Sequence, residues 1–150
     1  MAILKHDNSL WPLAVTVAQG ECTLEMHLNS LQAWDDWFNK AEPFVVIRVY
    51  NDEASLQHPK GAGPATQKWL KEGAAEQMQQ HVQAMLIVVP EQQFERMQKM
   101  SVQKAFGIPG AVVASLDDAH AWLMKTSNHN KTLEKTRFMQ IERLVHTLIL

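Results

Sequence analysis

Apolar residues gather in four short runs, which longer amphipathic stretches separate. The runs are rich in β-branched residues and read LAVTVA (13–18), FVVIRVY (44–50), AMLIVV (84–89) and GAVVAS (110–115). Strands that alternate with helix-sized segments pair in parallel, and a parallel sheet needs helices over its faces. The pattern therefore predicts an α/β fold with a mostly parallel sheet flanked by helices.

An antiparallel hairpin is predicted at the start of the chain. Two strand-like segments (2–6 and 10–17) flank the sequence Asp-Asn-Ser at 7–9, whose side chains favour a turn because they bond to nearby backbone groups. Pro12 has no N–H to donate, so its strand is expected at a sheet edge or to begin at that point. The hairpin gives a mixed sheet of about four to five strands.

The first helix is expected over residues 24–40, with Thr23 as its N-cap. Its inward stripe consists of apolar residues at helical spacing, namely Leu24, Leu28, Leu31 and Phe38, with Trp34 alongside. Trp34 and Trp37 cannot both face the centre of one stripe. One of them is therefore expected at its border or at a contact with another chain.

Three more helices are expected over 64–82, over 91–105 and from residue 116 onward, and a last one follows a polar linker at 126–130. Gly73 costs the second of these helices about 1 kcal/mol relative to alanine. Either the backbone packs closely at Gly73 or the helix ends early.

The predicted domain covers residues 1–126, and residues 127–150 form a helical extension that packs on this domain or on a second protomer. The extension ends in an apolar sequence without a polar tail, which suggests a homodimer. The candidate dimer residues share one helical face: Phe138, Ile141, Val145 and Leu148.

Two local patterns carry a family resemblance: VVPEQQFERM (88–97) and SLDDAHAWL (115–123). With the order of elements over about residues 2–125, they make the chain similar to the STAS-type, SpoIIAA-like domains of the anti-sigma-factor antagonist family. The resemblance implies a STAS-like fold and a non-enzymatic module that acts through protein contacts. Antagonists of that family carry a phosphorylatable serine in the loop where this chain has HPKGAGPATQ (58–67), so the phosphoserine switch is not expected here.

The loop 51–63 is the first place to look for a site, because it leaves the carboxyl end of a central strand. Its glycines, Lys60 and the following helix start could bind an anion or small ligand.

A lipid or small molecule bound in the crevice at the strand ends is thus the alternative to a protein-contact module. A hydrolase using Asp52, Ser55 and His58 is a third possibility. The candidate residues of this region are Asn51, Asp52, Ser55, His58, Lys60, Gly61, Gly63 and Thr66.

Composition narrows the classes of partner. The chain has 14 basic and 16 acidic residues without a basic block, which argues against nucleic acid or anionic lipid as partner. The apolar runs are too short to span a bilayer, and the first residues lack the apolar core of a signal peptide. Cys22 has no second cysteine to pair with, which favours a reducing compartment.

Seven histidines show no metal-ligand spacing. The sequence thus predicts a cytoplasmic protein without metal or cofactor.

Overall fold

The computed structural model describes residues 2–126 and 135–149, with side chains of the second segment described from residue 139 onward. Five strands form one sheet in the order β1-β2-β3-β4-β5, in which β1 and β2 are antiparallel and the remaining neighbours are parallel. The strands are β1 (Ile3–Leu10), β2 (Leu13–Gln19), β3 (Phe44–Tyr50), β4 (Val82–Val88) and β5 (Gly110–Val113). The predicted α/β fold with an N-terminal hairpin is confirmed.

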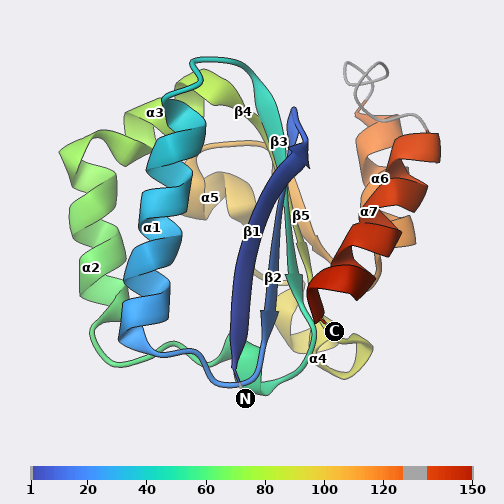
Figure 1. The fold of residues 1–150 in the computed structure, drawn as a ribbon, viewed down its shortest axis with the longest axis horizontal. Coiled ribbons are helices and arrows are strands. Elements are labelled where there is room, and N and C mark those ends of the chain that lie inside the picture. Colours follow the sequence, from blue (N-terminus) through green and yellow to red (C-terminus); the bar gives the residue numbers. More distant parts are fainter. Residues whose placement is uncertain (1, 127–134, 150) are drawn as a thin grey trace.

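Helices cover both faces of the sheet. On one face lie α1, α2, α3 and α5, and on the other lie α6 and α7 (Figure 1). The helices are α1 (Leu24–Phe38), α2 (Ala62–Trp69), α3 (Ala75–His81), α4 (Glu91–Met97), α5 (Val102–Phe106), α6 (Leu116–Lys125) and α7 (Lys135–Ile149), with a 3-10 turn η1 (Ala54–Leu56) and a π-helical turn η2 (Leu70–Ala74).

The hairpin turns at Trp11 and Pro12, so the predicted turn at 7–9 is wrong. Leu10 pairs with Leu13, and the pairing register shifts between Asp7 and Leu10. The Asp7 carboxylate accepts a hydrogen bond from the Ser9 N–H at 2.7 Å. The hydrogen bond between Asp7 and Ser9 thus accompanies a bulge within β1 and not the turn of the hairpin. Pro12 lies in the turn, where its missing N–H costs no ladder hydrogen bond.

The face under α6 and α7 carries an aliphatic core. Its fully buried members include Val15, Ile47, Leu86, Leu123 and Ile141. Val15, Ile47 and Leu86 come from β2, β3 and β4, where successive side chains point to opposite faces, and Leu123 and Ile141 come from α6 and α7.

The helix α7 packs on the protein's own sheet, where it contacts β1 and β2. Ile141 and Val145 are buried there, and Leu148 packs against the same core. Three of the candidate dimer residues thus contact their own chain. The side chain of Phe138 and most of the predicted linker (127–130) lie outside the described residues.

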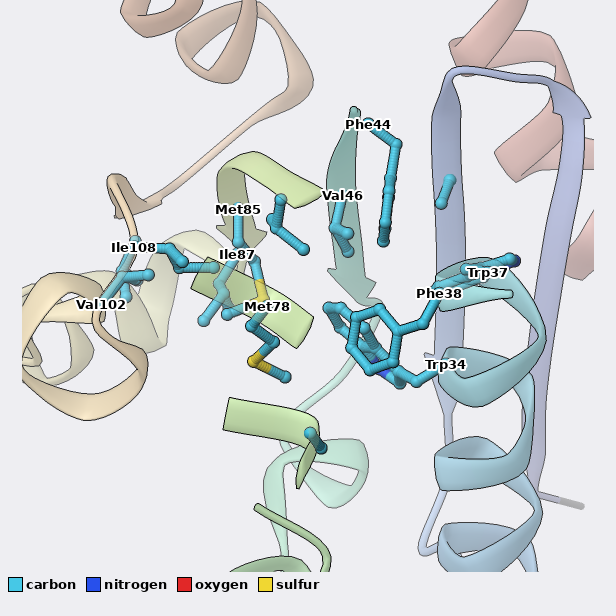
Figure 2. Close-up of a cluster of buried hydrophobic side chains, with 14 of the residues drawn as sticks. Trp34, Trp37, Phe38, Phe44, Val46, Met78, Met85, Ile87, Val102 and Ile108 are labelled. Atoms are coloured by element: carbon cyan, nitrogen blue, oxygen red, sulfur yellow. The ribbon is translucent and has the colours of Figure 1, made fainter. Parts of the chain in front are cut away.

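The opposite face carries aromatic rings and methionines. Figure 2 shows Trp34 and Phe38 reaching from α1 toward the centre of this cluster, where Met78 and Met85 lie. Trp34 and Trp37 are both buried within the chain, so neither ring is left for a contact with another chain. They fit together because the Trp37 ring packs edge-on against the ring of His6 on β1, with 5.9 Å between centroids.

The first half of α1 is more exposed than its apolar stripe predicts. Leu24 and Leu28 are 37% and 45% exposed, whereas Ser30 is buried. Aromatic side chains bury more area than leucines, so the rings of the second half determine which face of α1 turns inward.

The helix predicted over 64–82 is broken in the middle. Gly73 has φ 131° and ψ −14° inside the π-helical turn η2, which separates α2 from α3, and Figure 1 shows the change of direction. No atom lies within 4 Å of where a Cβ on Gly73 would be, so the glycine is needed for its backbone conformation and not for close packing.

The helix predicted over 91–105 is also divided, into α4 and α5. Ser101 caps α5, because its Oγ accepts a hydrogen bond from the Lys104 N–H at 3.1 Å. The predicted cap Thr23 is confirmed, and Ser115 caps α6 in the same way, since each side chain accepts a hydrogen bond from the backbone N–H three residues later.

Candidate functional site

A cavity of about 400 Å³ lies between the sheet and the helices α1 and α2. Its deepest walls are apolar and come from three elements: Trp34 of α1, Met78 of α3 and Met85 of β4, each at most 2% exposed. Leu31 lines the same space from α1 and Met97 from α4. The cavity thus adjoins the aromatic and methionine core.

The cavity lies toward the carboxyl ends of the central strands. Arg48 and Tyr50 from the end of β3 and Ile87 from the end of β4 form its floor. In open α/β sheets ligands bind at this end. The break at Gly73 lets α2 leave the direction of α3, and Thr66 and Trp69 of α2 form the opposite wall.

Arg48 is the charged side chain of this floor. It belongs to a row of paired positions across the sheet, in which His6, Thr16, Arg48 and Ile87 are successive neighbours. The guanidinium carbon lies 5.7 Å from the centroid of the Tyr50 ring. The Nε atom of Arg48 is buried without a hydrogen-bond partner, and no carboxylate in the described part of the chain forms an ion pair with Arg48. A charge against apolar walls is costly unless it is paired.

A polar contact between His27 and Thr66 joins α1 to α2 beside the cavity. The Nε2 atom of His27 lies 2.7 Å from the Thr66 hydroxyl, and both residues line the cavity. Burial lowers the pKa of His27, and the charge of Arg48 and the neighbouring His58 ring lower it further. The imidazole of His27 is therefore neutral at neutral pH.

His6 lies in the same row, beyond Thr16. Its Nδ1 atom lies 2.9 Å from the Thr16 hydroxyl. Burial, with a smaller contribution from the charge of Arg48, lowers the pKa of His6 to about 4. Arg48 thus carries the positive charge of this floor, and the two nearby histidines, His6 and His27, are neutral at neutral pH.

Asp52 and Ser55 hold the loop after β3 together. The Asp52 carboxylate accepts hydrogen bonds from the backbone N–H groups of Gly20 and Ser55 at 2.9–3.0 Å. The buried Ser55 hydroxyl donates to the Asp52 carbonyl oxygen at 2.7 Å. His58 is exposed and makes no hydrogen bond to either residue within the described part. The three residues therefore do not form the base-assisted hydroxyl that a hydrolase would use.

The remaining loop candidates divide into two groups. Asn51 donates to the Gln19 side chain at 2.6 Å on the surface, and Lys60 is exposed. The candidates that line the cavity are His58, Gly63 and Thr66, whereas Asn51, Asp52, Ser55, Lys60 and Gly61 do not.

Sequence reasoning missed Arg48, His27 and the methionine wall. The signal for Arg48 was a single charged residue inside the apolar run FVVIRVY. His27 carried no such signal, because its partner Thr66 lies 39 positions away in the chain.

Comparison with known proteins gives no relative: no family model, no curated protein and no solved structure matches this chain. The resemblance to STAS-like domains therefore stays a prediction. In residues 2–126 and 135–149, no group of three or more His, Cys, Asp or Glu side chains is placed to hold a metal ion. None of the described helices has the length and apolar character to cross a membrane.

Proposed function

We propose that this protein binds a small, largely apolar organic molecule in the cavity between α1, α2 and the sheet. The observation that carries the proposal is the cavity itself, of about 400 Å³, with its apolar walls. Ligand sites in proteins span roughly 300–1,000 Å³ and combine apolar walls with a few polar groups. Trp34, Met78 and Met85 supply the walls, and Arg48 and Thr66 supply polar groups.

The apolar dye N-phenylnaphthylamine tests this proposal, because its emission rises when it leaves water for an apolar site. We expect saturable binding and a decrease in tryptophan fluorescence, since Trp34 and Trp69 line the cavity. A linear rise in emission without saturation would show that the dye finds no defined site.

A matched pair of variants locates the bound dye. Ser30 is buried and lines the cavity, so the longer side chain of Ser30→Leu enters the cavity and weakens dye binding about tenfold or more. Asn29→Leu adds the same side chain at the next, exposed position of α1 and leaves dye binding unchanged. Equal effects of the two variants, or none from Ser30→Leu, would exclude the cavity as the site.

A STAS-like protein-contact module that acts as a homodimer is the second candidate function. Leu24 and Leu28 favour it, because they are exposed and lie one turn apart on α1. Sedimentation velocity at micromolar concentration tests the homodimer. We expect a dimer that Leu28→Glu dissociates, and a monomer in the unsubstituted protein would exclude this candidate.

A further inference from the structure

The cavity is apolar on most sides, yet its floor carries one permanent charge. Among the described residues, no aspartate, glutamate or lysine lines it. Arg48 is partly buried, and its Nε atom has no hydrogen-bond partner. Folding therefore leaves the Arg48 Nε–H buried without an acceptor, where an anion would be bound more strongly than in water.

We infer that the ligand of this cavity is a monocarboxylate with an apolar body, whose carboxylate pairs with Arg48. The inference rests on the proposed function, since it names the class of molecule that the cavity takes. A guanidinium presents N–H donors in a planar fork that matches the two oxygens of a carboxylate.

The number of charges favours a carboxylate over a doubly charged phosphate ester. Arg48 neutralises one negative charge, and the adjacent His27 is neutral at neutral pH because burial and Arg48 lower its pKa. The second negative charge of a phosphate ester would lie beside apolar walls without a positively charged partner, which is unfavourable.

The placement of the lining residues gives the ligand an orientation. Arg48 and Tyr50 stand at the end of β3, with the His27–Thr66 contact across from the sheet. The apolar residues Met78 and Met85 lie on α3 and β4. The carboxylate therefore points toward the end of β3, and the apolar body packs against the methionines.

The test uses the full chain and three ten-carbon probes that differ in the head group: decanoate, decanol and decylamine. Each probe competes with N-phenylnaphthylamine, and calorimetry measures its affinity directly. A charge-assisted hydrogen bond is worth about 1.5–3 kcal/mol, which corresponds to a roughly ten- to hundredfold change in affinity. We expect decanoate to bind at least about tenfold more tightly than decanol, and decylamine to bind most weakly.

Two variants show whether Arg48 causes the preference. Arg48→Met keeps a long unbranched side chain without charge, so decanoate loses about tenfold or more in affinity while decanol does not. Arg48→Lys keeps the charge without the fork and retains part of the preference. Lys60→Met is the matched control, because it removes an exposed positive charge from the loop after β3. It leaves decanoate binding unchanged.

The outcomes separate the inference from the proposed function. Equal affinities for decanoate and decanol, with no effect of Arg48→Met, would overturn the carboxylate inference and leave a general apolar site. A loss of decanoate binding in Lys60→Met instead of Arg48→Met would assign the anion to the loop and also overturn it. If neither the dye nor any probe binds, both proposals are wrong. Dye binding by Arg48→Met shows that this variant is folded.

Discussion

The two faces of the sheet are packed with different kinds of side chain. Under α6 and α7 the core is aliphatic, and Leu86, Leu123 and Ile141 are completely buried. Under α1, α2 and α3 the core combines aliphatic residues with tryptophan, phenylalanine and methionine, and it adjoins the cavity of about 400 Å³.

Shape explains why this cavity lies on the aromatic face of the sheet. Branched aliphatic side chains interdigitate closely, whereas planar rings and linear methionines fill irregular space less completely. The polar row of His6, Thr16 and Arg48 also lies on the cavity face. The aliphatic face thus has a closely packed core, and the aromatic face holds the cavity and its polar groups.

The same substitution on the two faces should have unequal cost. Leu123→Ala removes a fully buried side chain from the aliphatic core and should lower the free energy of unfolding by about 3 kcal/mol. Leu31→Ala enlarges a cavity that already exists and should cost about 1 kcal/mol, because Leu31 is only partly buried. Urea unfolding measures both. Equal losses would mean that the two faces are packed alike.

Acid should weaken the cavity face through His6. The pKa of His6 is about 4 in the folded protein against 6.5 for the free side chain. Between these values the unfolded chain binds more protons, so stability falls as the pH decreases. From about pH 7 to about pH 5, His6 should cost about 2 kcal/mol.

Urea unfolding over this pH range checks the effect of His6. His6→Gln should flatten the pH dependence, whereas His146→Gln, at an exposed position of α7, should leave it unchanged. A pH dependence that survives His6→Gln would assign it to other groups.

The two glycines of the α2–α3 segment should respond oppositely to alanine. Gly73→Ala puts a side chain on backbone with φ 131° and should destabilise the protein by about 1–2 kcal/mol. Gly63→Ala lies within α2, has open space for a Cβ and should stabilise by about 0.5–1 kcal/mol. Thermal unfolding compares them. If both variants gain stability, the break at Gly73 is not fixed by its backbone conformation.

Removing the charge from the cavity floor should make the ligand-free protein more stable. Arg48→Met replaces a guanidinium that has no ion-pair partner in the described residues and should raise the free energy of unfolding by about 1 kcal/mol. Lys60→Met, on the surface, should change it little. A loss of stability in Arg48→Met would show that the guanidinium supports the fold.

The apolar pattern of the sequence was sufficient to predict the strands and the α/β class. The runs at 44–50 and 84–89 became the central strands β3 and β4, because a strand buried on both faces needs apolar residues throughout. Thr23 and Ser115 were predictable as caps, since a cap bonds to a backbone group only three residues away.

The candidate site was predicted only in its outline. The loop after β3 was the right region, and His58, Gly63 and Thr66 do line the cavity. Asp52 and Ser55 instead stabilise the loop through hydrogen bonds to backbone groups. A local sequence pattern does not show which backbone groups a polar side chain will bond to.

Local patterns in the sequence were enough to place the strands and the helical regions, because these depend on periodicity and on contacts between near neighbours. The folded structure was needed to show that Arg48 lines a cavity, that His27 contacts Thr66, and that both tryptophans of α1 are buried. Those outcomes depend on contacts between residues far apart in the chain and on how large rings share space. A local sequence pattern contains information neither on these long-range contacts nor on the packing of the rings.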